Sequence, residues 1–280
     1  MHSLRVTPPY DFEGMLAFFA ARAIPRVESI EDGVYRRVLR WGPAQDLGWI
    51  EVRHAADAIE WRMSESLQLH REALMNKVAQ VLDVQAQPAQ INAVLKDLAL
   101  DCPGLRLPGT FDPFEISVRA VLGQQITVKA ARTLAHRLVQ RFGSPIDTPF
   151  AELDRAFPSA HDMAGCKPSD FGELGIIARR SLAIVELARL FAHRALSVDD
   201  DPEDWVEQLC AIPGIGPWTA NYIVMRACSH PDRWLAQDVV LLKALNLPKT
   251  QAGYRAAQAV AQQWGPWRSY AVLHLWRRSA

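Results

Sequence analysis

The pattern of apolar and polar positions divides the chain into an N-terminal third of mixed character and a helical remainder. Apolar residues at helical spacing predict a short buried helix over 12–22. Alternation of apolar and charged residues predicts strands at 49–53 and 59–63. A helical period returns over 70–84. Residues 1–88 are therefore expected to form a small α/β domain with an antiparallel sheet.

From about residue 90 onward the periodicity is helical throughout. One segment covers 91–100, and another covers 176–193. The long periodic segment 114–142 is interrupted by Gly123-Gln124-Gln125, so two helices are expected to meet there. An acidic run at 199–204 precedes the next helix. It is interpreted as a cap, because acids favour helix N-termini, with metal binding as the alternative.

The composition is that of an ordinary globular protein, with 49% hydrophobic and 22% charged residues among 280. It excludes disordered, collagen-like and coiled-coil classes. No run of 18 apolar residues predicts a membrane span, and the first residues do not resemble a signal peptide. The cysteines stand far apart and form no zinc-type pair, so reduced thiols in a cytoplasmic protein are expected. They are Cys102, Cys166, Cys210 and Cys228.

The overall charge is balanced, with 31 basic and 31 acidic side chains. A protein that grips nucleic acid through many phosphate contacts is usually more basic. If this protein binds DNA, it is expected to use few ion pairs and more main-chain contacts.

The segment 209–222 carries the most specific pattern in the chain. An apolar helix ends, Ile-Pro-Gly-Ile-Gly turns over 212–216, and a second helix is expected to begin at Pro217. Gly214 and Gly216 allow a sharp turn and a close approach by another molecule. The free amides of the new helix form an anion site suited to phosphate. This is the helix-hairpin-helix pattern, with an ordinary tight turn between helices as the alternative.

Asp238 is an acid in an otherwise apolar segment, and it therefore needs an explanation. It is expected to be the N-cap of a helix that begins at Val239, since aspartate is among the best N-caps. It is also a candidate catalytic carboxylate. The two interpretations are compatible, because a cap holds a carboxylate in place.

The hairpin, with an aspartate 238 − 218 = 20 residues after Trp218, resembles the helix-hairpin-helix-Gly/Pro-Asp superfamily of DNA glycosylases. Further strings resemble its 3-methyladenine DNA glycosylase II (AlkA) family across essentially the whole chain. These are Pro8-Pro9-Tyr10-Asp11, Met15-Leu16 with Phe18, Ala20-Ala21-Arg22, residues 103–109, 119–124 and 218–222, and Trp267-Arg268-Ser269-Tyr270-Ala271 with His274 and Trp276.

The resemblance implies a mechanism and two absences. Asp238 falls on the family's catalytic aspartate, which stabilises positive charge on the deoxyribose when an alkylated base departs, or orients the attacking water. Trp218 stands where bifunctional relatives carry a Schiff-base lysine, so a monofunctional glycosylase is expected. Some relatives hold an iron–sulfur cluster through four C-terminal cysteines. No cysteine follows Cys228, so no cluster is expected, and no cofactor is required.

The resemblance also implies how the damaged base is held. Phe18, Trp218, Tyr222 and Trp276 match positions that line the base pocket, although Phe18 equally suits plain core. Their electron-rich rings attract the positive charge of N-alkylated purines once the base has flipped out of the duplex.

The gap left by the flipped nucleotide is expected to be filled from the region of Gln124 and Gln125. A well-known relative has leucine where Gln125 stands, so the wedge residue is left open between Gln125 and Ile126. Gln237 is another departure from the family pattern, since the close relative has a second aspartate there.

At the hairpin, the resemblance implies DNA contacts and an ion. DNA contacts are expected at Gly214, Ile215, Gly216 and Thr219. The main-chain carbonyls of Cys210, Ile212 and Ile215 are expected to hold a Na⁺ or K⁺ ion that bridges to a DNA phosphate.

The expected architecture is mainly α with an N-terminal α+β domain, and two helical lobes flanking an active-site cleft. One lobe is expected at 113–230, and the other combines 89–112 with 231–280. The expected function is that of a monofunctional glycosylase acting on duplex DNA with alkylated bases such as 3-methyladenine and 7-methylguanine. It is expected to be a monomer without membrane contact, and nucleoid-associated if bacterial. The alternatives are a non-catalytic binder of damaged DNA and a glycosylase for deaminated bases such as hypoxanthine or uracil.

Overall fold

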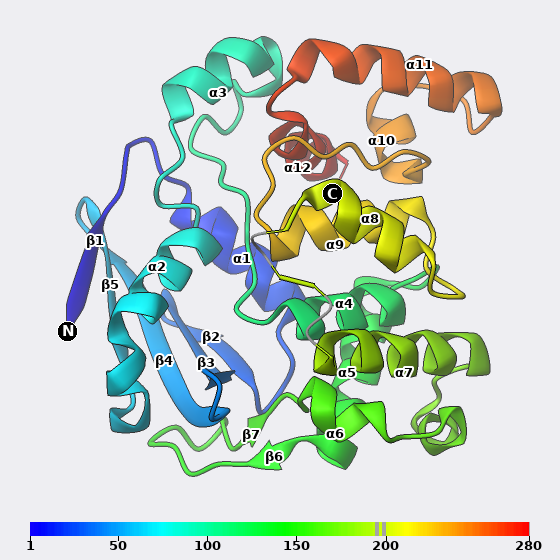
Figure 1. The fold of residues 1–280 in the computed structure, drawn as a ribbon. Helices are drawn as coiled ribbons and strands as arrows, with labels where there is room; N and C mark the ends of the chain where they lie inside the picture. The colour runs from blue at the N-terminus through cyan, green and yellow to red at the C-terminus, as the bar shows by residue number, and fades with distance from the viewer. Residues whose placement is uncertain (194–195, 198–199, 280) are drawn as a thin grey trace.

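The computed structural model describes residues 1–193, 196–197 and 200–279, and it is mainly helical with a small N-terminal sheet (Figure 1). Of the acidic run predicted at 199–204, Asp199 lies outside the described residues. Among the described residues, no helix is both long and apolar enough to cross a bilayer.

The N-terminal sheet has five antiparallel strands in the order β1-β5-β4-β3-β2. Its strands are β1 (His2–Arg5), β2 (Glu28–Glu31), β3 (Val34–Trp41), β4 (Asp46–Ala55) and β5 (Ala58–Met63). The strands predicted at 49–53 and 59–63 are confirmed as parts of β4 and β5. Their alternate residues Ile50, Val52, Ile59 and Trp61 are buried, as the period of a half-covered sheet requires.

Helices supply the rest of the molecule. Near the sheet lie α1 (Phe12–Arg22) and α2 (Arg71–Val81), whereas α3 (Pro88–Leu95) lies away from it. Next come α4 (Pro113–Leu122), α5 (Val128–Phe142), the short β6 (Ser144–Pro145) and β7 (Arg155–Ala156), α6 (Ala160–Ala164) and α7 (Ala178–Ala192). The chain ends with α8 (Pro202–Cys210), α9 (Pro217–Ala227), α10 (Val239–Ala244), α11 (Gln251–Ala261) and α12 (Arg268–Arg278). Short 3₁₀ turns lie at Glu65–His70, Lys96–Leu98, Pro168–Leu174 and Gln262–Trp264.

These helices confirm the main elements that the periodicity predicts. The helix at 12–22 is α1, and the interrupted segment 114–142 is the pair α4 and α5. The segment 70–84 contains α2 over Arg71–Val81; His70 ends the preceding 3₁₀ turn, and residues 82–84 form a turn after the helix. The acidic cap before α8 is present, since Asp201 accepts a hydrogen bond from the amide of Glu203.

Three large hydrophobic clusters form most of the core, beside a small fourth one of Val38, Leu153 and Ala156. One packs the sheet against α1 and α2. A second is built by α4, α5, α7, α8 and α9. The third joins α3 to α10, α11 and α12, so segments far apart in the chain share one core (Figure 1). The domain boundaries predicted at 88, 112 and 230 are not themselves tested by these clusters and stay predictions.

A buried ion-pair network joins the sheet to α4. Arg37 on β3 lies 2.7 Å from Glu115, and Arg119 lies 2.9 Å from Glu28 and 2.8 Å from Glu115. Burial alone would lower the pKa of Arg119, but the Glu28 and Glu115 carboxylates outweigh it and raise that pKa. Arg119 also donates to the Arg22 carbonyl, at the end of α1. The network therefore fixes the N-terminal sheet and α1 against the helix that leads into the cleft described below.

Candidate functional site

A cleft of about 980 Å³ lies between the helices of the second and third clusters. Residues of α1, α4, α5, α7, α9, α10 and α12 line it, together with the turns before α5, α9 and α10. It gathers most of the residues that the sequence singles out: Gln124, Gln125, Ile126, Gly214, Gly216, Trp218, Thr219, Tyr222, Gln237, Asp238 and Trp276.

The charge of this cleft differs from the charge of the chain. Seven basic residues line it, and Asp238 is its one acid among the described residues. The basic residues are Arg22, Arg119, Arg132, Arg179, Arg180, Arg226 and Lys249. The lining of the cleft is therefore basic although the net charge of the chain is zero, but Arg119 is paired with Glu28 and Glu115, and Arg226 is buried. The expectation of few ion pairs to phosphate stays a prediction. No charge run in the sequence marks this surface, because its members come from six separate segments.

The hairpin has the predicted form. α8 ends at Cys210 and α9 begins at Pro217, with the turn between them. Gly214 has φ +100°, a conformation that favours glycine, whereas Gly216 is extended with φ −103°. Only Gly214 is therefore needed for the turn itself. At Gly216 an added Cβ would meet no protein atom within 4 Å, so glycine there leaves open space at the start of α9.

Asp238 is buried and held at three points. It caps α10, as predicted, because its Oδ1 accepts hydrogen bonds from the amides of Val240 (2.7 Å) and Leu241 (3.0 Å). Its Oδ2 accepts a hydrogen bond from the indole N–H of Trp218 at 3.0 Å. Only 7% of the residue is exposed, yet it lines the cleft. The carboxylate is therefore fixed in one orientation at the cleft wall.

Two aromatic side chains on α9 and one on α12 form a wall beside this carboxylate. The rings of Trp218 and Tyr222 stack with centroids 5.5 Å apart and planes 9° apart. Trp276 meets Tyr222 at 6.3 Å with a tilt of 47°. Spacing of four residues places Trp218 and Tyr222 on the same face of the helix. This wall combines flat rings and an acid, which suits a planar cationic ligand.

Phe18 lies apart from the other three aromatic residues. Its ring packs between the first and third hydrophobic clusters. The guanidinium carbons of Arg22 and Arg226 lie 3.7 Å and 4.8 Å from its ring centroid. Both arginines line the cleft, so they separate the Phe18 ring from the open space. The structure therefore favours the core interpretation of Phe18.

Arg226 is a site residue that the sequence analysis missed. It donates to the Tyr222 hydroxyl at 2.9 Å and to the carbonyls of Pro108 and Gly109. Burial would raise the pKa of Tyr222, but Arg226 and Arg22 outweigh it and lower that pKa. The only sequence signal was its spacing of four residues after Tyr222 on one helix face.

Both candidates for the wedge residue lie in the turn between α4 and α5, and they differ in exposure. Gln125 is exposed, whereas Ile126 packs partly buried against the second cluster. Both line the cleft. Gln237 is likewise exposed beside Asp238, with a left-handed φ of +68°. Of the two wedge candidates, Gln125 is thus the freer to enter a duplex.

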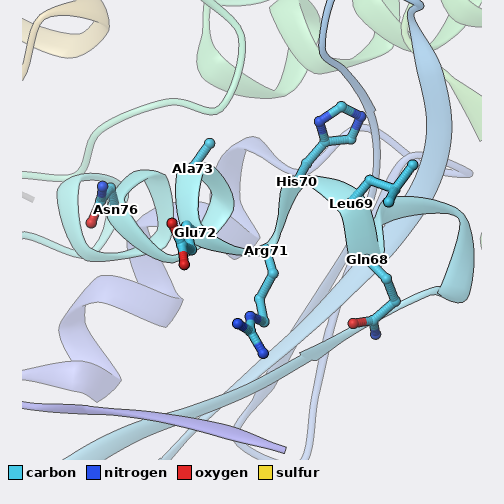
Figure 2. A pocket seen from close by; sticks show the side chains of 7 residues that line it. All are labelled: Gln68, Leu69, His70, Arg71, Glu72, Ala73 and Asn76. Atoms are coloured by element: carbon cyan, nitrogen blue, oxygen red, sulfur yellow. The ribbon is translucent and has the colours of Figure 1, made fainter.

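A second hollow, of about 590 Å³, lies at the start of α2 and contains none of the predicted site residues (Figure 2). Its labelled side chains point in different directions, and Leu69 is 96% exposed. It has neither a fixed carboxylate nor an aromatic wall, so the candidate site is the cleft at Asp238.

Comparison with known proteins gives matches over the whole chain. Residues 1–112 match the family model described as the AlkA N-terminal domain. Residues 118–265 match the model described as HhH-GPD superfamily base excision DNA repair protein. The chain is 35% identical to DNA-3-methyladenine glycosylase 2 of Escherichia coli, over 99% of this chain and 96% of that protein.

Two further matches extend this comparison. The chain is 38% identical to a probable bifunctional transcriptional activator/DNA repair enzyme AlkA of Mycobacterium tuberculosis, over 98% of this chain and 56% of that protein. The solved 3-methyladenine DNA-glycosylase from Archaeoglobus fulgidus has the same fold, with a TM-score of 0.85 at 21% identity, covering 100% of this chain and 98% of that one.

Proposed function

The chain belongs to the HhH-GPD superfamily of base excision DNA repair proteins, and on that premise we propose that it excises 3-methyladenine and related alkylated bases from duplex DNA. It is a DNA glycosylase, a hydrolase of base excision repair. The observation that carries the choice of substrate is the buried Asp238 carboxylate beside the rings of Trp218, Tyr222 and Trp276.

In this proposal Asp238 stabilises the charge that develops on the deoxyribose when the base departs. An oxocarbenium-like sugar is positive, and a fixed carboxylate in a partly dry site stabilises it without reorganisation. Three donors already occupy lone pairs of this carboxylate: the amides of Val240 and Leu241 and the indole of Trp218. An ionised carboxylate has about four acceptor sites, so one site remains on Oδ2, beside the Trp218 indole. The proposed main role is electrostatic stabilisation by a carboxylate held in a fixed orientation, and the remaining site is free to orient a water.

The proposed reaction ends with an intact strand. A lyase step needs a nucleophilic amine that forms a Schiff base with the sugar. Trp218 occupies the position beside Asp238, and its indole nitrogen is a donor to the carboxylate and not a nucleophile. The enzyme is therefore proposed to be monofunctional and to leave an abasic site.

Base recognition is proposed to rest on the aromatic wall. An N-alkylated purine is a flat cation, and each ring face attracts it by about 0.5–2 kcal/mol, depending on desolvation. The duplex must first release the base, because the glycosidic carbon is unreachable inside the stack. One chain supplies all the residues that line the cleft, which supports a monomer. Because its proposed substrate is duplex DNA, in a bacterium it would act at the nucleoid.

The test is base release from methylated duplex DNA by the wild-type protein. We expect release of 3-methyladenine and 7-methylguanine, with no strand nick until the abasic sites are cleaved by alkali. Hypoxanthine-containing duplex is assayed beside it. Faster release of hypoxanthine than of 3-methyladenine would favour the specialised alternative, and tight binding without release would favour a non-catalytic binder.

The hairpin is proposed to bind a DNA phosphate through main-chain amides. In the described part of the chain, the amides of Gly214 and Gly216 have no hydrogen-bond acceptor. Gly216→Ala adds a methyl group only to the open space, so we expect duplex affinity to fall about tenfold, on the order of losing one hydrogen bond to a charged group. Fluorescence anisotropy with duplex DNA measures this.

Gly165→Ala is the matched control for this substitution. Gly165 also has open space around an added Cβ and an ordinary φ of −86°, and it lies outside the cleft. Gly214→Ala is less informative, because its positive φ adds strain to any loss of contact. Unchanged affinity of the Gly216→Ala protein would sink the phosphate argument.

The proposal includes a Na⁺ or K⁺ ion at the hairpin, and the carbonyls present fit it. Among the described residues the Cys210 and Ile215 carbonyls accept no hydrogen bond outside the helices, and the Ile212 carbonyl accepts one, from the Ile215 amide. Such an ion would supply positive charge to a phosphate. Duplex binding is titrated in Na⁺, K⁺ or choline at constant ionic strength, and equal affinity in all three would contradict the ion.

A further inference from the structure

Gln124 was predicted to belong to the wedge region, but its side chain is turned inward. Its Nε2 donates to the carbonyl of Gly214 at 2.9 Å and to the hydroxyl of Thr219 at 3.1 Å. Gly214 lies in the hairpin turn, and Thr219 lies in the first turn of α9. One amide group therefore joins the turn between α4 and α5 to the hairpin, across about 90 residues of sequence.

The main chain of Gln124 is also held. Its carbonyl accepts a hydrogen bond from the guanidinium of Arg180, on α7. The hairpin lies against the same helix, since a Cβ atom added at Gly214 would lie 3.4 Å from the carbonyl oxygen of Arg179. Gln124 thus sits where α4, α7 and the hairpin meet.

This arrangement bears on Gln125, the next residue. Gln125 has a left-handed φ of +55°, a backbone conformation that residues other than glycine adopt uncommonly. Its own side chain is exposed and lines the cleft. The Gln124 carbonyl, which belongs to the peptide just before Gln125, is the group held by Arg180.

The arrangement bears equally on the hairpin. The Gly214 carbonyl belongs to the turn whose free amides are proposed to bind phosphate. A donor on that carbonyl fixes the orientation of the peptide that follows Gly214. The same side chain therefore orients two elements that meet DNA, one at the backbone and one at the flipped nucleotide.

We propose that Gln124 is a positioning residue that locks the wedge residue Gln125 to the hairpin, so that phosphate capture sets how the wedge enters the duplex. This rests on the proposed glycosylase function. Phosphate contacts fix register on DNA, and a wedge tied rigidly to them needs no separate ordering step. Gln124 is predicted to matter for duplex DNA, where a base must be unstacked, and much less where it is already unstacked.

The test compares release of 7-methylguanine from a duplex and from the same strand alone, under single turnover. For Gln124→Ala we expect the ratio of duplex to single-strand rates to fall about tenfold, the order produced by losing one or two neutral hydrogen bonds. Thr219→Val removes one acceptor and keeps the Gly214 carbonyl, so a smaller fall is expected. Fluorescence of 2-aminopurine next to the lesion reports the flipped population, which should fall with the ratio.

Gln90→Ala is the matched control, since Gln90 is an exposed glutamine on α3 outside the cleft. Its ratio should equal that of the wild type. A Gln124→Ala protein whose two rates fall together, or do not fall, would overturn the positioning role. A wild-type protein that releases no base from either substrate would instead contradict the proposed function, so the two failures are distinguishable. The melting midpoint of each variant separates loss of folding from loss of positioning.

Discussion

Asp238→Asn is expected to bind duplex DNA as the wild type does and to lose base release by a factor of about 100 or more. That factor corresponds to about 3 kcal/mol of barrier, the magnitude measured when one preorganised electrostatic group is removed from an active site. The substitution keeps the size of the side chain and an oxygen that can cap α10. It removes the negative charge that the developing sugar cation needs, and it places an NH₂ group near the Trp218 indole N–H.

The measurement is single-turnover release of 7-methylguanine, with duplex affinity determined in parallel. Asp57→Asn serves as control, because Asp57 lies in the turn between β4 and β5 with 74% of its side chain exposed. Wild-type rates from the Asp238→Asn protein would show that the carboxylate is not the catalytic group. Trp218→Phe keeps a ring in the wall and removes only one donor to Asp238. Its rate of base release should therefore fall less than that of Asp238→Asn.

The largest expected effect on stability is that of Arg119→Met. It leaves Glu28 and Glu115 buried with Arg37 as their remaining basic partner. Breaking a buried ion pair by removing one partner costs about 3–5 kcal/mol, because a charge is left uncompensated. We therefore expect the free energy of unfolding to fall by about this amount in urea denaturation at pH 7.

The pH dependence of this loss gives a second readout. Burial would raise the pKa of Glu28, but Arg119 and Arg37 outweigh it and hold that pKa below its usual 4.5. The stability that the lowered pKa supplies is therefore present above about pH 4.5 and is lost as the pH falls through the folded value. The difference between wild type and Arg119→Met should shrink in the same range.

Arg189→Met is the control for this network. Arg189 pairs with Glu186 on an exposed face of α7, and such pairs contribute about 0–1 kcal/mol. If the free energy of unfolding falls no more in Arg119→Met than in Arg189→Met, the buried network does not stabilise the contact between the sheet and α4. Because Arg119 also holds the Arg22 carbonyl, a large loss would mean that the N-terminal domain and the cleft are stabilised together.

Several features of the site were readable from local sequence because their physics is local. The hairpin follows from the Pro-Gly-Ile-Gly string, and the cap at Asp238 follows from one carboxylate and the two amides it faces. The stack of Trp218 on Tyr222 follows from helical spacing. The resemblance to a glycosylase family connected these separate strings to one function, and the comparisons confirm that family.

Other features were set by contacts between distant segments. The inward turn of the Gln124 side chain, next to Gln125, depends on the hairpin 90 residues away. The placement of Phe18 behind Arg22 and Arg226 depends on how α1 packs against α9. The basic lining of a chain with no net charge depends on six segments converging at one cleft.

The sequence by itself thus determined the helices, the hairpin, the capped aspartate and the family, since each rests on residues within a few turns of one another. Only the tertiary structure decided which aromatic rings face the cleft, where the positive charge gathers and how the wedge is held. The physical reason is that hydrogen bonds and charge pairs act over a few ångströms in space. Residues far apart in sequence enter that range only when the three hydrophobic clusters have packed.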